Sequence, residues 1–468
     1  MMEMKEALQK IHEASMRILE RTGMKFLHPE AGEILKAHGV KEKNGAFCFT
    51  EKQIMDWVGK APETFTFKAR NSAYDAEIGG DNYVCAPGYG APQICDAEGV
   101  KRDAIMKDYI QIAKLFQVNP FYKTNGGILV QPSDVPPEIS PTLMHYAALT
   151  HSDKCLQCPS GYQDQMEIMM EMSKIVFGGL DAPRMITIVN TNSPLQLDGV
   201  MVDTLLTFGR NGQPTCVSAA VMAGTTGPIT LAGTLAVANA EVLAGIALLQ
   251  MACPGAPVVY GNQSTTSDMA TGSMAGGSPE GALCYKYGAQ LAKFYKLPSR
   301  GGGAPSDGRV LNGQAGYEAM LTYMSSVTNG MNYIIHSAGI MDGFSSMSYE
   351  KLIMDFEINR MVDRYHRGVE VNEETVQEDM IDRVGHGGNY MTEKHTFKYC
   401  RKETFIPKIG TRGRVDNPAT QFNTNIENQL QTMFKQYEQP KLPDSTLREI
   451  DALLESKGIK IKNYFPEA

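Results

Sequence analysis

The feature that most constrains the fold of this chain is a repeated alternation of apolar strands and helices between residues 105 and 370. We expect strands at residues 122–130, 154–160, 185–190, 215–221, 257–262, 297–302 and 333–337. Helices are expected between them, at residues 141–151, 164–177, 198–211, 234–252, 280–296, 313–329 and 348–367. Such alternation is typical of strands that run in one direction and are joined by helical crossovers, so it predicts a parallel sheet covered by helices.

The number of repeats favours a closed barrel. Seven repeats are clear and an eighth is obscured by a strand-rich region before residue 105, which predicts an α/β fold of the TIM (β/α)8 barrel type. A doubly wound open sheet is the rival, but no Gly-x-Gly-x-x-Gly follows the first strand. We expect N-terminal helices and an antiparallel hairpin in residues 1–104, built from strands at 64–70, 83–86 and 91–96. The barrel then occupies residues 105–370, and residues 371–468 form a C-terminal extension.

Charge and hydropathy exclude several classes of partner. The formal net charge is −8 and no basic stretch occurs, whereas nucleic acids and anionic membranes are bound by clustered Lys and Arg. No uncharged apolar run reaches the roughly 20 residues that span a bilayer, and the first residues form no apolar leader. The nine cysteines are odd in number and scattered, as reduced buried thiols are. The sequence predicts a cytoplasmic protein.

In an α/β barrel the active site lies at the carboxyl ends of the strands. The predicted strand ends carry glycines, small residues and amides, and His336 is the one titratable base directly on such an end. No histidine pair has metal-binding spacing, so we expect no tightly bound metal. A lyase or hydrolase that uses His336, Asp307 and Asp342 around a metal remains an alternative.

Two glycine-rich segments are the most distinctive motifs. Residues 222–233 read MAGTTGPITLAG and residues 253–262 read CPGAPVVYGN, followed in order by LPSRGGG at 297–303 and QAGYE at 314–318. With these motifs the chain resembles the trimethylamine methyltransferase superfamily over roughly residues 60 to 410. The resemblance implies an α/β barrel and a cobalamin-dependent transfer of a methyl group.

One departure from that superfamily narrows the expected substrate. The founding trimethylamine enzymes carry pyrrolysine near the segment that here reads IIHSAGIMDGF, residues 334–344, and this chain has standard residues throughout. It therefore resembles the branch without pyrrolysine, whose members demethylate quaternary amines such as glycine betaine, proline betaine, carnitine and γ-butyrobetaine. A trimethylamine methyltransferase lacking pyrrolysine and a non-catalytic barrel that binds or senses betaines are the alternatives.

The resemblance also implies the cofactor and the partners. Cobalamin would be carried by a separate cognate corrinoid protein, whose Co(I) takes the methyl group, since this chain lacks the Asp-x-His-x-x-Gly motif of cobalamin carriers. The reaction needs no protein nucleophile, so no catalytic side chain is expected. The family and the C-terminal extension predict a symmetric homo-oligomer.

The expected site residues follow from the chemistry of a quaternary amine. Such a cation donates no N–H hydrogen bond, so aromatic faces would surround it. Tyr89 and Phe344 are the first candidates, and Tyr83 and Phe356 are the second. Candidates for polar contacts are His336, Arg300 and Arg309 toward a substrate carboxylate, and Asn190, Gln263 and Gln314 for orientation.

Overall fold

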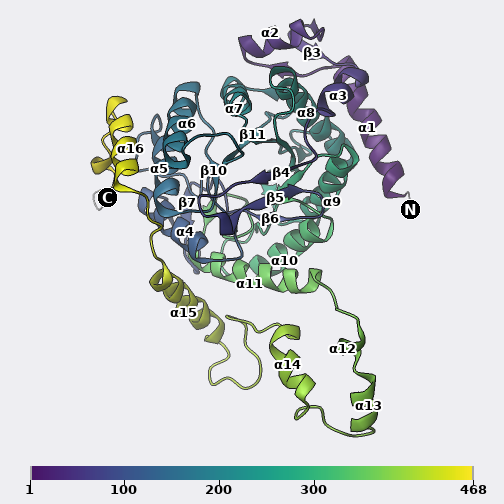
Figure 1. The fold of residues 1–468 in the computed structure, drawn as a ribbon. Coiled ribbons are helices and arrows are strands. Elements are labelled where there is room, and N and C mark those ends of the chain that lie inside the picture. Colours follow the sequence, from purple (N-terminus) through teal and green to yellow (C-terminus); the bar gives the residue numbers. More distant parts are fainter. Residues whose placement is uncertain (1–2, 466–468) are drawn as a thin grey trace.

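The computed structural model describes residues 3–465, and its centre is a sheet of eight parallel strands (Figure 1). In spatial order the strands are β6 (Val84–Cys85), β19 (Tyr333–Ile335), β18 (Ser299–Gly302), β15 (Val258–Asn262), β13 (Thr215–Ala219), β11 (Met185–Asn190), β10 (Cys155–Cys158) and β9 (Thr124–Gly126). Thr124 Oγ1 donates to the Cys85 carbonyl across the remaining gap at 2.9 Å. The predicted barrel is confirmed, and the open doubly wound sheet is wrong, because the strands follow one another around the barrel in chain order.

A ring of helices covers the outer face of the barrel (Figure 1). The ring consists of α4 (Met106–Val118), α5 (Ser140–His151), α6 (Gln163–Phe177), α7 (Gly199–Arg210), α8 (Leu231–Ala252), α9 (Pro279–Phe294), α10 (Gly313–Thr328) and α11 (Tyr349–His366). Helix α8 alone among the described residues is long and apolar enough to cross a membrane, but 78% of its apolar window is buried inside the protein. It is a core helix, because α1, α3 and the barrel wall enclose it.

An antiparallel hairpin closes the amino-terminal end of the barrel. It consists of β4 (Thr64–Phe67) and β5 (Ala76–Gly79). Phe65, Phe67 and Ile78 pack in one apolar cluster with side chains of the barrel interior such as Ile186. The Lys68 amide donates to the carbonyl of Pro183, which precedes β11, at 2.8 Å. The amino-terminal end is therefore closed, which leaves the carboxyl end, where the site is expected.

The predicted pairing of residues 83–86 and 91–96 in a hairpin is wrong. β6 is a barrel strand and pairs in parallel with β19, so the barrel sheet begins before residue 105. β7 (Gln93–Cys95) pairs with β8 (Lys101–Asp103) and with β21 (Ser346–Met347), next to β20 (Ile340–Met341). The reason is that Val84 and Ala86 are buried in the barrel core, among residues from distant parts of the chain. The local alternation of apolar and polar residues does not show such contacts.

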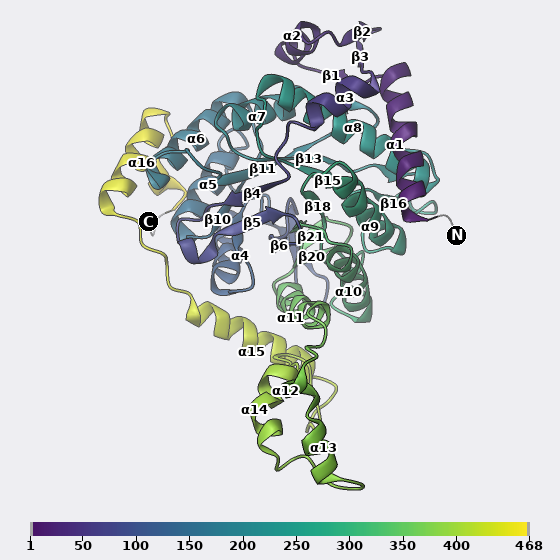
Figure 2. The same ribbon diagram turned by 45° about the vertical axis from the view of Figure 1, so that its right-hand side comes forward.

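The remaining helices and strands lie outside the barrel, in the N-terminal part, in the loops between barrel elements and in the C-terminal part. The N-terminal layer contains α1 (Met4–Arg21), β1 (Lys25–Phe26), α2 (Pro29–Ala37), β2 (Lys41–Lys43), β3 (Ala46–Cys48), α3 (Glu51–Val58) and η1 (Ser72–Tyr74). Loop strands are β12 (Gln196–Leu197), β14 (Met222–Ala223), β16 (Thr265–Ser267) and β17 (Met274–Ala275). The C-terminal part contains α12 (Glu373–Val376), α13 (Glu378–Val384), α14 (Lys394–Glu403), α15 (Gln421–Gln436), α16 (Asp444–Ser456) and η2 (Ile461–Asn463). Helices α15 and α16 lie on the barrel, whereas α12 to α14 project from it (Figure 2).

Candidate active site at the mouth of the barrel

Arg300 lies inside the barrel near its open end. It is the second residue of β18 and pairs in register with Gly261 of β15 and Tyr333 of β19, so its side chain points inward. The side chain is 2% exposed; Nη1 donates to Ser218 Oγ at 2.8 Å, and Nε has no hydrogen-bond partner. Burial lowers the pKa of Arg300, yet a guanidinium stays protonated at neutral pH. Arg300 forms no ion pair with a carboxylate of residues 3–465, so the barrel interior holds an uncompensated positive charge.

His336 directly contacts this guanidinium. Arg300 Nη2 donates to His336 Nε2 at 3.3 Å, so Nε2 is the acceptor and Nδ1 carries the hydrogen. Burial, together with the Arg300 charge, lowers the pKa of His336 well below its ordinary value and keeps the ring neutral. Nδ1 is buried and has no partner. Two adjoining side chains therefore each present one unpaired N–H donor, an arrangement suited to a carboxylate ligand.

Aromatic rings flank His336 on two sides. The Phe344 ring lies edge-on to the imidazole at 4.9 Å between centroids, and the Tyr89 ring lies edge-on at 6.5 Å. Both aromatic residues are half-buried and pack against the apolar clusters of the barrel. His336 and Phe344 have φ values of +59° and +72°, in the left-handed region that non-glycine residues seldom adopt. Strain of this kind is often kept where a side chain must be aimed at a ligand.

Asp307 lies next to the Phe344 ring. Its carboxylate accepts hydrogen bonds from the amides of Gly276 at 2.8 Å and Gly277 at 3.1 Å. A Cβ on Gly276 would meet both the Phe344 ring and Asp307 Oδ1, so these two side chains are neighbours across this glycine. Burial raises the pKa of Asp307 to about 6. The carboxylate is therefore mostly ionised at neutral pH and supplies a negative charge near the aromatic ring.

Of the predicted amides, Asn190 and Gln263 lie at carboxyl ends of barrel strands. Asn190 ends β11, pairs with Ser218 and is exposed at the mouth. Gln263 Nε2 donates to Tyr285 Oη at 2.6 Å, and its buried Oε1 has no partner. Gln314 lies at the start of α10 instead, where its Nε2 donates to Glu318 Oε1 at 2.9 Å.

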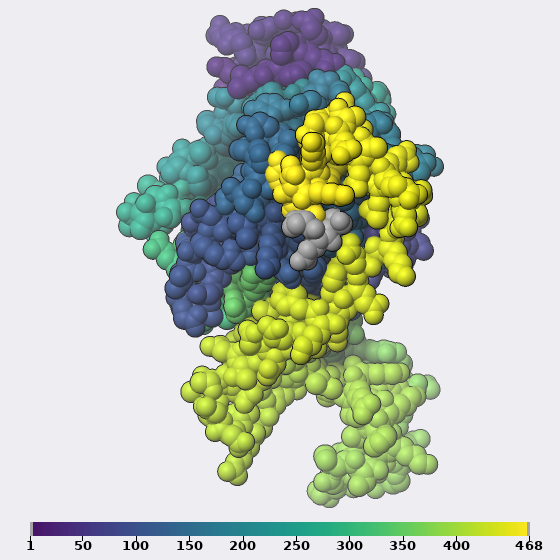
Figure 3. All heavy atoms as spheres, turned by 90° about the vertical axis from the view of Figure 1, so that its left-hand side faces the viewer, coloured from purple at the N-terminus to yellow at the C-terminus, as the bar shows by residue number. Residues whose placement is uncertain are grey.

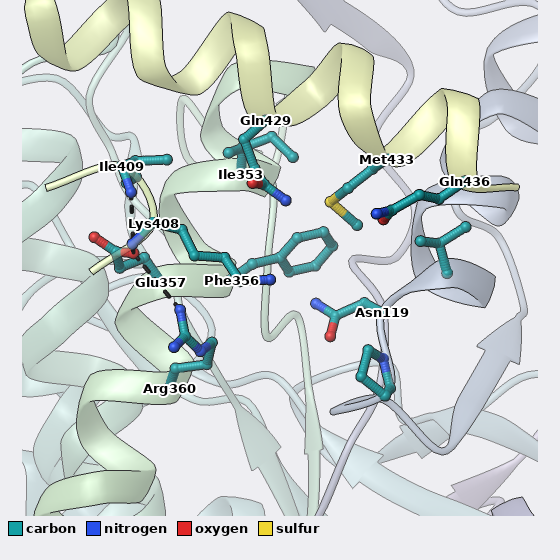
Figure 4. A pocket seen from close by; sticks show the side chains of 12 residues that line it. Asn119, Ile353, Phe356, Glu357, Arg360, Lys408, Ile409, Gln429, Met433 and Gln436 are labelled. Atoms are coloured by element: carbon teal, nitrogen blue, oxygen red, sulfur yellow. Dashed lines mark hydrogen bonds and ion pairs between the residues drawn. The ribbon is translucent and has the colours of Figure 1, made fainter. Parts of the chain in front are cut away.

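Three predicted residues do not join this group. Tyr83 precedes β6 at the closed end of the barrel, where its hydroxyl donates to Asp363 Oδ1 at 2.7 Å. Phe356 lies on the outer side of the barrel, where it lines a cavity between α11 and α15 (Figure 4). Arg309 is an exposed loop residue whose Nε pairs with Asp342 Oδ1 at 3.1 Å. The structure thus corrects the expected positions of Tyr83 and Phe356, which lie away from Arg300 and His336. A contact of Arg309 with the substrate stays a prediction.

Several residues that hold the mouth in place were not predicted to do so. Glu241 of α8 accepts hydrogen bonds from Thr191 Oγ1 at 2.5 Å and from Ser193 Oγ at 2.8 Å, and so fixes the loop after β11. The fully buried Lys351–Asp355 pair of α11 binds the Ala304 carbonyl and the Gly339 amide, which belong to the loops after β18 and β19. A carboxylate inside an apolar helix was the available signal for Glu241, because such a group needs partners.

The metal site of the alternative lyase or hydrolase would use His336, Asp307 and Asp342. In the part of the chain that the structure describes, no three His, Cys, Asp or Glu side chains are placed to hold one ion. Asp342 instead pairs with Lys101 and Arg309.

Comparison with known proteins agrees with this arrangement. The model of the family described as "Trimethylamine methyltransferase (MTTB)" matches residues 1–461. The chain belongs to this family. A glycine betaine methyltransferase of Desulfitobacterium hafniense is 38% identical over 96% of this chain and 95% of its own length. A trimethylamine methyltransferase of Methanosarcina barkeri is 32% identical over 84% of this chain and 81% of its own length. The resemblance that the sequence motifs predicted is therefore confirmed.

One more distant relative and one solved structure also match this chain. A proline betaine:corrinoid methyltransferase of Eubacterium limosum is 28% identical over 98% of this chain and 95% of its own length. A solved structure of the Methanosarcina barkeri monomethylamine methyltransferase has a TM-score of 0.53 at 10% identity, and it covers 92% of this chain and 87% of that one. The latter likeness shows the fold alone. Members of the trimethylamine methyltransferase family thus include enzymes named for both tertiary and quaternary amines.

Proposed function

We propose that this protein is a methyltransferase that moves a methyl group from a betaine, a quaternary amine with a carboxylate, to a corrinoid protein. The observation that carries the proposal is the buried Arg300, whose charge has no carboxylate partner among the described residues. Burying an unpaired charge costs several kcal/mol, so such a group is typically kept for a ligand of opposite sign. The named relatives that act on glycine betaine and proline betaine support the same substrate class.

The two ends of a betaine match two parts of the mouth. The carboxylate would accept hydrogen bonds from Arg300 Nε and His336 Nδ1, two adjoining buried donors that lack partners. The ammonium group would lie against Tyr89 and Phe344, with the Asp307 carboxylate contributing a further attraction. A cation bound through aromatic faces gains about 0.5–2 kcal/mol per contact.

Trimethylamine fits this mouth less well than a betaine. It has no carboxylate, so Arg300 Nε and His336 Nδ1 would stay unpaired, and each unpaired buried donor costs about 1–3 kcal/mol. A non-catalytic betaine sensor is the second candidate, because the same contacts would bind a betaine whether or not it is demethylated. Only turnover separates an enzyme from a sensor.

The role of this chain in the reaction is to position the substrate. When bound, the corrinoid of the partner protein supplies the cobalt nucleophile that receives the methyl group. The β4–β5 hairpin closes the amino-terminal end of the barrel, so such a partner would approach the carboxyl end, where Asn190 and Ala220 are exposed. With its carboxylate held by Arg300 and His336 and its ammonium group by the aromatic rings, a betaine would point one N-methyl group toward the mouth. Such orientation accounts for much of the rate in group transfer. We expect this to take place in the cytoplasm.

The experiment is a turnover assay with the purified protein and free cob(I)alamin under anoxic conditions. Glycine betaine, proline betaine, carnitine and trimethylamine are added separately, and the demethylated amine is measured by proton NMR together with the cobalamin absorption spectrum. We expect demethylation of at least one betaine and none of trimethylamine. Betaine binding without turnover, also after addition of a corrinoid protein, would support the sensor instead.

A further inference from the structure

The segment of residues 367–408, which we name the arm, leaves the barrel after α11 and stands away from the rest of the molecule (Figures 2 and 3). Met380 is its one buried residue. Its helices α12, α13 and α14 have only four, seven and ten residues. Helices shorter than about 12–15 residues are marginal in water unless one face is packed. The arm therefore needs a partner surface that one copy of this chain does not supply.

The arm also exposes a large amount of apolar surface. Val371 is 77% exposed, Met391 78% and Phe397 86%. Further exposed apolar side chains of the arm are Val369, Val376, Ile381, Tyr390 and Ile406. Scattered single apolar residues are ordinary on a surface, but a cluster on one projecting segment marks an interaction site.

The root of the arm is fixed rather than loose. The Glu357 carboxylate of α11 accepts hydrogen bonds from the amides of Ile409 at 3.2 Å and Gly410 at 2.8 Å, beside the cavity shown in Figure 4. Arg364 Nη2 pairs with Glu403 Oε1 at 2.7 Å. These contacts hold the returning end of the arm against α11, from which its other end departs, so the arm is presented in a defined direction.

From these observations we infer that the arm packs against the arm of a second copy of this chain. Its charges are self-complementary, because the exposed face of α13 is acidic and that of α14 is basic. On α13 and α14, six exposed charged residues have no ion-pair partner among the described residues: Glu378, Asp379, Asp382, Lys394, Arg401 and Lys402. In a two-fold arrangement, α13 of each copy would face α14 of the other, and the apolar side chains would lie between them.

The position of the arm disfavours the corrinoid protein as its occupant. The end of α11 from which the arm departs lies at the closed end of the barrel, since Asp363 binds Tyr83 there. A corrinoid must approach the open mouth on the opposite side. This choice between occupants rests on the proposed function, whereas the need of the arm for a partner does not.

Sedimentation of the full-length protein at micromolar concentration tests the inference. We expect the wild type to sediment at twice the mass of one chain or a multiple of it, and Phe397→Glu to weaken self-association at least about tenfold. Leu27→Glu, a change at another exposed apolar residue outside the arm, should sediment as the wild type. A monomeric wild type, or an unchanged Phe397→Glu, would overturn the inference whatever the outcome of the turnover assay.

Charge reversal tests the pairing of α13 with α14. The double variants Glu378→Lys/Asp379→Lys and Arg401→Glu/Lys402→Glu should each self-associate more weakly than the wild type, because like charges then face each other. Mixed together, the two variants should associate with each other, since both contacts are then of opposite sign. Failure of the mixture to associate would refute this pairing.

Discussion

Replacing Arg300 by methionine should remove affinity for betaines while leaving the protein folded. The guanidinium is 2% exposed, and its hydrogen bonds within the protein go to Ser218 and His336. Truncating one partner of a buried charge pair costs about 2–5 kcal/mol of binding free energy. A loss of about 3 kcal/mol, at 1.4 kcal/mol per factor of ten, raises Kd roughly 100-fold.

Isothermal titration calorimetry with two ligands isolates the carboxylate. Glycine betaine should bind Arg300→Met roughly 100-fold more weakly than the wild type, whereas tetramethylammonium, which has no carboxylate, should bind no more weakly. Because a buried unpaired charge is removed, the free energy of unfolding should not fall, and we expect it to rise by about 1 kcal/mol or more.

Arg309→Met is the matched control, since Arg309 is an exposed arginine of a neighbouring loop whose side chain pairs with Asp342. Its Kd for glycine betaine should stay within about twofold of the wild-type value, as for exposed ion pairs. The reasoning fails if Arg300→Met binds glycine betaine as tightly as the wild type. It also fails if both ligands lose the same affinity, because the lost contact would then not involve the carboxylate.

Three further perturbations test the rest of the site. Phe344→Leu should weaken binding of tetramethylammonium about 3- to 30-fold, whereas Phe356→Leu should lower only the thermal unfolding temperature. Asp307 has its pKa raised to about 6, so the affinity for a betaine should rise as pH increases through 6 and its carboxylate ionises; calorimetry of Asp307→Asn should show a flat pH profile. Lys351→Met should lower the free energy of unfolding by about 3–5 kcal/mol in urea titrations, and adding Asp355→Leu should restore most of it, because both buried charges are then gone.

The sequence predicted the barrel because its strands and helices alternate over a long stretch, a pattern that few folds produce. It did not place β6 correctly. This strand has two residues, and its partner β19 lies about half the chain away, so nothing local distinguishes it from a strand of a hairpin. The hairpin that does form, β4 with β5, follows a clear alternation at Thr64–Phe67.

The sequence also predicted the positions of some site residues and not those of others. Arg300 and His336 were predicted because the carboxyl ends of barrel strands carry the site in this fold, and the structure places the two side chains in contact. Tyr83 was misplaced because it lies one residue before Val84, which points into the barrel, and neighbouring residues of a strand face opposite sides. Phe356 was misplaced because helix periodicity does not show which neighbour a buried face contacts.

By itself, the sequence determined the fold class, the family and the set of polar residues on strand ends. The tertiary structure decided which of these residues act together. Ser218 lies in β13, Arg300 in β18 and His336 directly after β19, and their contacts form only when the barrel closes. The absence of a carboxylate partner for Arg300 within residues 3–465 is a property of that closed interior, because it depends on every side chain that packs around the charge.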